Sequence, residues 1–408
     1  MSEPQKMLNA DEALELLLSH ARPLDEVERI HTTHALGRVL AQSLVSGVTV
    51  PPLDNSAMDG YAVACADFKA GGETRLKVAQ RIPAGSLGHA LERGTAARIF
   101  TGAPVPPGAD AVVMQEDCTA EGDEVLIRAT PKSGANIRRA GEDITIGQEI
   151  LRAGVKMRPQ EMGLAASIGL ADVPVYRKLR VALFFTGDEI VMPGEPLQEG
   201  EIYNSNRYTL LGLLEGMGCR VADFGIVPDS LEATVEVLNQ AWREADLIIT
   251  SGGVSVGGED HVKAAVERTG KIDMWKVAMK PGKPIAYGTV HDTPFIGLPG
   301  NPVSAFATFC LFVRPYILRC QGAEKVAPRS YLLPAAFEWN KPGKRREFVR
   351  GRLEPRADGA LAVAIYPNQS SGVLTSVAWS EGLAEIREGS TVAHGDAIRF
   401  TPFSELLG

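Results

Sequence analysis

The sequence VALFFTGDE, at residues 181–189, sets the pattern for the middle of the chain: an apolar run ends in threonine, glycine and two carboxylates. Continuous apolar runs are typical of strands that are buried on both faces of a parallel sheet. Other apolar runs lead into three more polar loops, SGGVSVG at 251–257, KPGKP at 280–284 and GLPGNP at 297–302. Because ligands of α/β proteins bind at the carboxyl edge of such a sheet, we expect the four loops to gather there.

Strand-like and helix-like patterns alternate between residues 180 and 320. Apolar runs at 181–185, 220–227 and 246–251 are each followed by a helical stretch, at 204–217, 231–244 and 259–269. This alternation predicts parallel strands joined by right-handed helical crossovers. The fold class expected from it is multidomain α/β, with a central three-layer domain and a mostly parallel sheet.

The flanking regions show other patterns. Residues 11–50 have helical spacing, with Asp11 as the expected cap of the first of two helices. Residues 51–148 contain short alternating runs between Gly and Pro, which predict a β-rich domain. Asp358-Gly359 predicts a two-residue hairpin turn in a small C-terminal β-barrel. The predicted divisions are a helical segment (1–50), the β-rich insert (51–148), a return through the first domain (149–178), the α/β domain (179–325) and the β-barrel (326–408).

Length and composition describe an ordinary multidomain protein. A chain of 408 residues exceeds the size of a single hydrophobic core. It carries 42 Lys and Arg against 50 Asp and Glu, a net charge of -8, without a concentrated basic stretch, so we expect no nucleic-acid partner. Five scattered cysteines, a mixed acidic N-terminus and the lack of a long apolar run favour a reduced, cytoplasmic protein with no membrane span.

The glycine-rich and proline-rich loops suit a phosphorylated ligand. Glycines at 252–258 let backbone amides approach a phosphate closely, although a simple strand-to-helix turn would use glycines too. No GxGxxG occurs, and Gly282-Lys283 is followed by Pro284, so the two common nucleotide motifs are disfavoured. Asn301-Pro302 matches a helix cap with proline at the first helical position, and such a helix start attracts anions.

Carboxylates and lysines supply the charges for such a ligand. Asp188, Glu189, Asp229 and Asp260 lie in loops after predicted strands and suit Mg²⁺, which prefers oxygen ligands together with substrate phosphates. Asp229 has an alternative role, because with Glu232 it matches a capping box. Lys280 and Lys283 lie on a segment stiffened by proline and suit an oxyanion, the alternative being a solvated surface turn.

Seven motifs occur together: DNSAMDGYA at 54–62, TGAP at 101–104, GEDI at 141–144 and the four loops described above. In this combination the whole chain resembles the molybdopterin molybdenumtransferase family, which includes bacterial MoeA and the E domain of gephyrin. The resemblance implies an enzyme that cleaves the phosphoanhydride of adenylyl-molybdopterin in a step dependent on molybdate and Mg²⁺, and inserts molybdenum at the dithiolene. The implied products are molybdenum cofactor and AMP.

The resemblance also assigns roles to residues. It implies catalytic roles for Asp59, Asp188, Glu189, Lys280 and Lys283, and a Mg²⁺ site made by Asp188, Glu189, Asp229 and Asp260. The implied substrate-binding residues are Thr101, Asp143, Thr186, Gly252, Gly253, Ser255, Pro299, Asn301, Pro302, Arg350 and Ser371. It implies a homodimer with shared active sites, in which Asp59, Thr101 and Asp143 come from the partner subunit, and a molybdopterin adenylyltransferase as donor partner. Ala140 departs from the family pattern, where we expect arginine.

Two other functions stay open at this point. A molybdopterin adenylyltransferase would resemble only the middle of the chain, and the long flanking segments favour the insertion step instead. A non-catalytic scaffold, as in gephyrin, normally accompanies extra domains and a linker, which the sequence does not show. The choice between molybdenum and tungsten is also left open.

Overall fold

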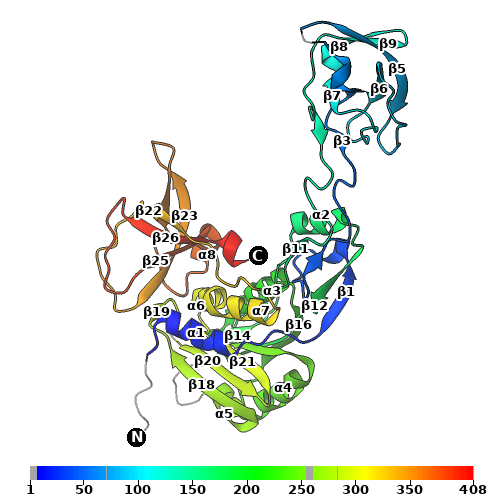
Figure 1. The fold of residues 1–408 in the computed structure, drawn as a ribbon. Coiled ribbons are helices and arrows are strands. Elements are labelled where there is room, and N and C mark those ends of the chain that lie inside the picture. The colour runs from blue at the N-terminus through cyan, green and yellow to red at the C-terminus, as the bar shows by residue number, and fades with distance from the viewer. Residues whose placement is uncertain (1–6, 70, 254–260, 283, 408) are drawn as a thin grey trace.

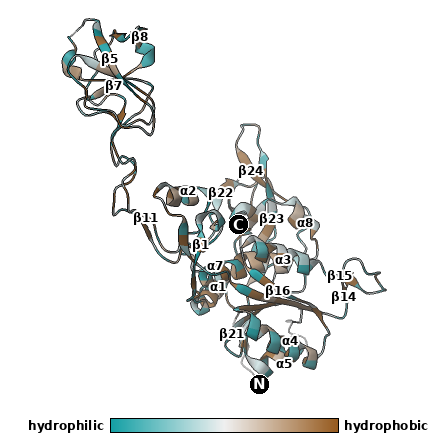
Figure 2. Cartoon of the chain, turned by 90° about the vertical axis from the view of Figure 1, so that its right-hand side faces the viewer, coloured by the Kyte–Doolittle hydropathy of each residue, from teal (hydrophilic) through white to brown (hydrophobic). Residues whose placement is uncertain are grey.

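The computed structural model describes residues 7–69, 71–253, 261–282 and 284–407, which form four regions in an elongated arrangement (Figure 1). A central α/β core carries the C-terminal β domain on one side and a small linker domain on the other. Two extended segments rise from the linker domain to a distal β domain, and the perpendicular view in Figure 2 shows the same separation. The distal β domain therefore stands well away from the core of its own chain.

The α/β core is built on a six-stranded mixed sheet in the order β16-β13-β17-β21-β20-β18. The first four strands are parallel to one another, and β20 is antiparallel to both of its neighbours. The strands are β13 (Arg180–Thr186), β16 (Arg220–Val227), β17 (Leu247–Ser251), β18 (Gly270–Lys276), β20 (Pro284–Val290) and β21 (Thr293–Leu298). The helices are α3 (Ser205–Gly216), α4 (Leu231–Glu244), α5 (His261–Thr269), α6 (Pro302–Thr308) and α7 (Arg314–Cys320), with a π-helical stretch at Phe309–Val313.

Alternate residues of β13 pack on opposite faces of this sheet. Leu183 and Phe185 join a core cluster that includes residues of α3, α6 and α7. Ala182 and Phe184 pack in a second cluster with residues of α4 and α5. Because β13 is covered on both faces, its apolar run is continuous, and the predicted three-layer α/β domain is confirmed.

The N-terminal region differs from the prediction. Helix α1 (Ala10–His20) forms, but its cap is Asn9, whose Oδ1 accepts a hydrogen bond from the Glu12 amide at 2.9 Å, and Asp11 lies inside the helix. In place of the second helix, the chain forms strand β1 (Val27–His31) and a 3-10 turn at Thr32–His34. Among the described strands, β1 pairs with β12 (Asp172–Tyr176) alone. It is largely exposed and lacks the apolar alternation that marks a half-buried strand. The linker domain also contains β2 (Leu44–Val45), β11 (Glu149–Leu151) and α2 (Pro159–Ser167).

The distal β domain contains a six-stranded sheet, as the alternating runs predicted. The order is β7-β4-β6-β5-β9-β8, and the short pair β3 and β10 lies at its base. Below it, an isolated bridge between Val50 and Ile144 holds the two connecting segments together. The strands are β3 (Asn55–Ser56), β4 (Gly60–Val63), β5 (Thr74–Ile82), β6 (Thr95–Ile99), β7 (Ala111–Met114), β8 (Cys118–Glu121), β9 (Glu124–Ile127) and β10 (Ile137–Arg138).

The C-terminal β domain is a curved six-stranded sheet. Its order is β19-β23-β25-β26-β22, with β24 paired to β23, and a bridge between Ala335 and Val363 brings the two ends together as in a small barrel. The predicted hairpin joins β23 to β24, but its loop spans residues 356–360 and is longer than a two-residue turn. The elements are β19 (Met279–Lys280), β22 (Tyr331–Pro334), β23 (Arg346–Pro355), β24 (Leu361–Ile365), β25 (Gly382–Ile386), β26 (Ala397–Pro402), α8 (Thr375–Trp379) and α9 (Phe403–Leu406).

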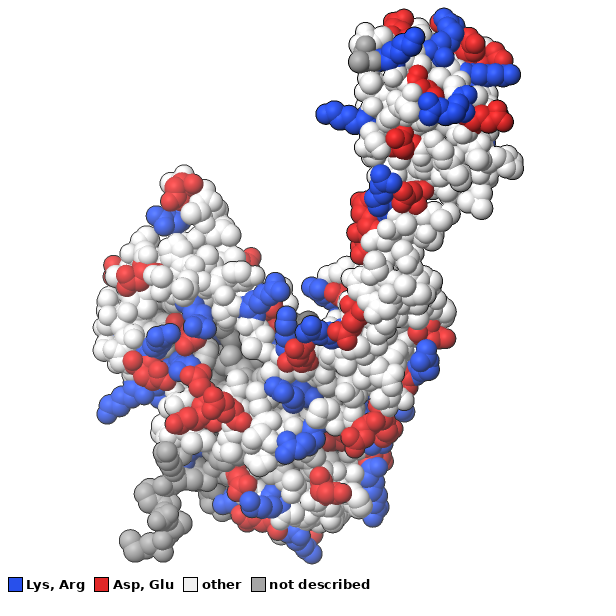
Figure 3. All heavy atoms as spheres, viewed as in Figure 1, with Lys and Arg blue, Asp and Glu red and all other residues white. Residues whose placement is uncertain are grey.

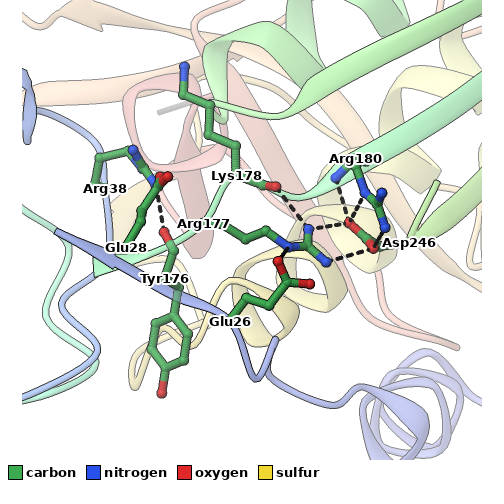
Figure 4. Close-up of polar contacts among 8 residues, drawn as sticks. All are labelled: Glu26, Glu28, Arg38, Tyr176, Arg177, Lys178, Arg180 and Asp246. Atoms are coloured by element: carbon green, nitrogen blue, oxygen red, sulfur yellow. Dashed lines mark hydrogen bonds and ion pairs between the residues drawn. The ribbon is translucent and has the colours of Figure 1, made fainter. Parts of the chain in front are cut away.

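An ion-pair cluster around Asp246 ties the linker domain to the α/β core (Figure 4). Asp246 precedes β17, and its carboxylate accepts hydrogen bonds from Arg177 at 2.6 and 2.9 Å and from Arg180 at 2.7 Å. Arg177 also pairs with Glu26 at 3.0 Å. Burial acts to raise the pKa of Asp246, but the arginine hydrogen bonds outweigh it and lower this pKa to about 2.

The apolar helical stretch at 302–320 belongs to the buried core. The helical stretch Pro302–Cys320 is long and apolar enough to cross a bilayer by composition, but 89% of its apolar window is buried inside the protein, as in the core helix of a soluble protein. All five cysteines are free thiols, and burial raises the pKa of Cys310 to about 12. Three of them, Cys219, Cys310 and Cys320, are buried.

Candidate functional site

The described parts of the four predicted loops lie at one edge of the central sheet. Parallel strands β13, β17 and β21 end at this edge. The connection between β18 and β20 reaches the same edge because β20 is antiparallel to β21. Of the predicted site residues, Ser255, Asp260 and Lys283 lie outside the described residues.

The turn after β17 packs directly on the end of β13. Gly252 and Gly253 have φ of +102° and +62°, a region that favours glycine. A Cβ at Gly252 would lie 2.4 Å from the Thr186 carbonyl oxygen, and one at Gly253 would lie 2.6 Å from Thr186 Oγ1. The Thr186 hydroxyl is buried, and none of the residues that the structure describes forms a hydrogen bond with it. Close packing therefore requires glycine at both positions. From the sequence alone, this reason for the glycines could not be distinguished from a phosphate-binding role.

Asn206, which sequence reasoning missed, joins three parts of this edge. Its Nδ2 donates to Ser251 Oγ at 2.9 Å and to the Gly300 carbonyl at 2.7 Å. Ser251 Oγ in turn donates to the carbonyl of Pro299 at 3.0 Å. The amide of Asn206 thus fixes the end of β17 relative to the turn that opens α6. The feature of the sequence that could have pointed to Asn206 is its carboxamide, which lies in the first turn of a helix that starts at the edge of the sheet where a ligand was expected.

The start of α6 is also a contact with the C-terminal β domain. Pro302 occupies the first helical position as predicted, but the exposed Asn301 side chain makes no capping hydrogen bond. The backbone amide of Val303 donates to the Ser371 carbonyl at 3.0 Å. The helix start therefore keeps the Asn301 side chain available, while one of its backbone donors is taken by Ser371.

Arg350 is a buried guanidinium beside this contact. Its side chain is among the largest fully buried ones, with the residue 1% exposed. Its nitrogens donate to Ser376 Oγ at 3.1 Å and to the carbonyls of Phe348 and Ser370 at 3.4 and 3.3 Å. Within the described ranges no carboxylate forms an ion pair with it, and burial lowers its pKa to about 10. A buried cation without a paired acid favours binding of an anion.

Lys280 lies where the α/β core meets the C-terminal β domain. Its Nζ pairs with Glu347 Oε2 at 3.1 Å across the parallel ladder between β19 and β23. A Cβ at the neighbouring Gly282 would lie 2.6 Å from the buried hydroxyl of Thr308 in α6. Residues 280–282 are therefore held between α6 and the C-terminal β domain. On the face shown in Figure 3, Lys and Arg side chains are interspersed with Asp and Glu.

The predicted metal ligands are only partly brought together. Asp188 and Glu189 follow β13 as adjacent exposed carboxylates, while Asp229 precedes α4. Residue Ser230, not Asp229, caps α4, with Ser230 Oγ accepting from the Ala233 amide at 3.3 Å, so the predicted capping role of Asp229 was wrong. In the part of the chain that the structure describes, no group of three His, Cys, Asp or Glu side chains could hold a metal by itself. Two carboxylates with substrate phosphates still fit Mg²⁺ chemically.

Asp59, Thr101 and Asp143 lie in the distal β domain and its connecting segment, apart from the other site residues in the same chain. Asp59 Oδ1 accepts from the Thr101 amide at 2.8 Å and from the Thr101 hydroxyl at 2.7 Å. These hydrogen bonds lower the pKa of Asp59. Asp54, from the same loop, is engaged by the Ala140 amide at 2.8 Å and by Arg139 at 2.5 Å. Asp54 thus holds the base of the distal domain, and the main chain of Ala140 supplies one of these contacts.

Family models match three consecutive parts of the chain. Residues 8–169 match the MoeA N-terminal region (domain I and II), residues 182–319 match a probable molybdopterin binding domain, and residues 333–403 match the MoeA C-terminal region (domain IV). Together these three segments span nearly all of the described fold.

Similar proteins share almost the full length. A molybdopterin molybdenumtransferase of Haemophilus influenzae is 38% identical, with 98% of this chain and 100% of that protein covered. Molybdopterin molybdenumtransferase 2 of Mycobacterium tuberculosis is also 38% identical, with 90% of this chain and 94% of that protein covered. The crystal structure of the molybdopterin biosynthesis MoeA protein of Pyrococcus horikoshii OT3 has a TM-score of 0.84 at 29% identity, covering 97% of this chain and 100% of that one.

Proposed function

The chain belongs to the MoeA family and is a transferase of molybdenum cofactor biosynthesis. We propose that it inserts molybdenum from molybdate into adenylyl-molybdopterin, and that this happens where the α/β core meets the C-terminal β domain. The observation that carries this location is Arg350, a buried cation with no paired carboxylate in the described part of the chain, beside the start of α6. The products are molybdenum cofactor and AMP.

The phosphates of the substrate lie along the edge formed by Thr186, Gly252, Gly253 and the turn through Pro299, Asn301 and Pro302. Ser255, also expected to bind phosphate, lies outside the described residues. Support comes from the exposed Asn301 side chain, which makes no capping hydrogen bond at the start of α6. Mg²⁺, when bound by Asp188 and Glu189 with help from Asp229 or Asp260, supplies positive charge at the pyrophosphate. Asp188 and Glu189 fit this role because they are adjacent and exposed at the end of β13.

Arg350, Lys280 and Lys283 provide positive charge where oxyanions bind or leave. The Arg350 guanidinium holds molybdate through planar hydrogen bonds, with the Ser371 loop beside it. Lys280 and Lys283 neutralise the charge that develops on AMP as the phosphoanhydride bond breaks. The interdomain position of Lys280, 3.1 Å from Glu347, supports this assignment.

The active form is a homodimer whose sites each draw residues from two subunits. Asp59, Thr101 and Asp143 stand apart from Arg350 in one chain, so a second chain supplies them to the same cleft. A mixed dimer tests this directly, with Asp59→Asn in one subunit and Arg350→Ala in the other. A shared site restores about half of the wild-type activity in the mixed dimer, because one of the two clefts then has both side chains intact. Inactivity of the mixed dimer would place both residues in one subunit's site.

The two rival functions fit less of the chain. A molybdopterin adenylyltransferase accounts for residues 182–319 but not for the matches to MoeA regions on both sides. A scaffold role leaves the uncompensated Arg350 without a purpose. We place the enzyme in the cytoplasm, receiving substrate from a separate adenylyltransferase.

The test of the proposed function is AMP release from purified adenylyl-molybdopterin with Mg²⁺, in the presence and absence of molybdate. Release that depends on molybdate and yields active molybdenum cofactor supports the transferase reaction. Absence of release in both conditions, from folded protein, contradicts it.

A further inference from the structure

Glu347 is a nearly buried carboxylate at the boundary between the α/β core and the C-terminal β domain. Its side chain is 11% exposed, and its Oε2 lies 3.1 Å from Lys280 Nζ, whose side chain is 45% exposed. The acid is thus fixed inside the protein while its basic partner reaches solvent. Of the two, Lys280 is the side chain that can turn towards a ligand.

The backbone holds this pair in place. Lys280 lies opposite Glu347 in the ladder between β19 and β23, and the Arg346 amide donates to the Ala278 carbonyl at 3.0 Å. On its other side, Glu347 Oε1 is so close to Gly343 that a Cβ there would lie only 2.9 Å away. The carboxylate is therefore confined between Lys280 and the turn at residue 343.

Arg350 follows Glu347 by three residues on β23. Burial lowers the pKa of Arg350, and the negative charge of Glu347 acts in the opposite direction. Glu347 pairs directly with Lys280 and acts on Arg350 only through the longer-range attraction of its charge, because side chains three residues apart on a strand point to opposite faces. An anion that binds Lys280 must compete with Glu347 for the ammonium group.

We propose that Glu347 is a built-in counter-ion that an oxyanion displaces from Lys280, and that this competition sets how tightly the site binds molybdate. This inference rests on the proposed function, which places molybdate near Arg350 and Lys280. Because the competing charge opposes every oxyanion, it weakens the binding of sulfate as well as that of molybdate. An anion that makes few contacts besides the one with Lys280 then leaves the site largely empty, at a concentration at which an anion with more contacts fills it.

The test is calorimetric titration of molybdate, and separately of sulfate, into the full-length protein and its Glu347→Gln variant. The substitution keeps the shape of the side chain and removes its charge. Since partly exposed ion pairs have modest strength, we expect the dissociation constants of both anions to fall by roughly two- to fivefold. The gain must vanish in the Lys280→Gln background, where there is no ammonium to release. Glu354→Gln, which removes a carboxylate paired with Arg352 farther along β23, is the matched control and leaves affinity unchanged.

Glu347→Asp provides a second variant in case the glutamine disturbs folding. It withdraws the carboxylate from Lys280 by one methylene, so its affinity for molybdate should lie between those of the wild type and Glu347→Gln. Unchanged or weaker binding in the folded Glu347 variants overturns the inference. If molybdate binding is instead indifferent to both Lys280→Gln and Arg350→Ala, the oxyanion binds elsewhere, and the proposed site fails together with the inference.

Discussion

The backbone carbonyl of Ser371 accepts a hydrogen bond from the backbone amide of Val303 at 3.0 Å, which joins the C-terminal β domain to the first turn of α6. The neighbouring Ser370 carbonyl accepts from Arg350 at 3.3 Å. These two contacts bring the Arg350 guanidinium to the edge of the sheet where the glycine-rich and proline-rich loops end. The C-terminal β domain is therefore a wall of the proposed active site.

Arg350→Lys tests whether the planar guanidinium is needed. Lysine keeps the charge but has no pair of parallel donors, so we expect molybdate-dependent AMP release to fall about 100-fold. Arg352→Ala is the control, because Arg352 lies on the same strand but is 42% exposed and paired with Glu354. Both variants are compared with the wild type by steady-state AMP release at saturating substrate. Activity near the wild-type level in Arg350→Lys would show that charge alone is sufficient.

Asn206→Ala tests the positioning role of the amide network. The substitution removes donors to Ser251 and to the Gly300 carbonyl, so the turn that opens α6 is no longer fixed to β17. We expect AMP release to fall by about 10- to 100-fold because reacting groups are misplaced. The loss of two hydrogen bonds should cost only about 1–3 kcal/mol of stability. Asn239→Ala on α4 provides a matched control and should be fully active; equal activity of the two variants would refute the role of Asn206.

Glu189→Ala separates catalysis from folding. The side chain is exposed on a loop after β13, so its removal should leave the midpoint of thermal unfolding and the oligomeric state unchanged. We expect AMP release to fall at least about 100-fold because the pyrophosphate loses a carboxylate that holds Mg²⁺. Glu195→Ala, on the exposed segment that follows, is the control. A lowered unfolding midpoint or a monomeric variant would assign Glu189 a structural role.

Asp246→Asn tests the ion-pair cluster between the linker domain and the core. The folded-state pKa of Asp246, about 2, is below its ordinary value of 3.8, so the unfolded chain binds the proton more readily. The stabilisation is therefore complete above about pH 4 and is lost as the pH falls towards 2. At pH 7 the asparagine variant should be less stable by about 2 kcal/mol.

Thermal unfolding across pH 2 to 7 checks this sign. The difference between wild type and Asp246→Asn should be largest at neutral pH and should shrink below pH 4. Glu26→Gln, which removes a carboxylate that is 70% exposed from the same Arg177, should cost less than about 1 kcal/mol. A difference that grows on acidification would contradict the assignment.

The sequence predicted the α/β core well because its patterns are local. The apolar run at Val181–Phe185 required a strand covered on both faces, and the amphipathic run at Leu231–Glu244 required a helix on one of them. Strand β1 was missed because its partner, β12, is more than 140 residues away and leaves it largely exposed. Asp11 was predicted as the cap of α1 and Asn9 was missed, because both residue types cap helices well and only the backbone conformation selects between them.

The site was predicted as a set of loops but not as a network. Thr186, Gly252 and the start of α6 lie together because parallel strands end at a common edge, which topology alone dictates. Asn206 and Glu347 were missed because their roles depend on partners in other elements, Gly300 in one case and Lys280 in the other. The separation of Asp59 from Arg350 depends on the length of the connecting segments and on no local pattern.

The most direct test of the central claim is the position of molybdenum in a crystal of this protein soaked with molybdate, located by anomalous diffraction at the molybdenum edge. If molybdate binds where we propose, the peak lies within hydrogen-bonding reach of the Arg350 guanidinium, beside Lys280 and the start of α6. A peak in the distal β domain, or none near Arg350 in crystals of protein that releases AMP only with molybdate, would contradict it.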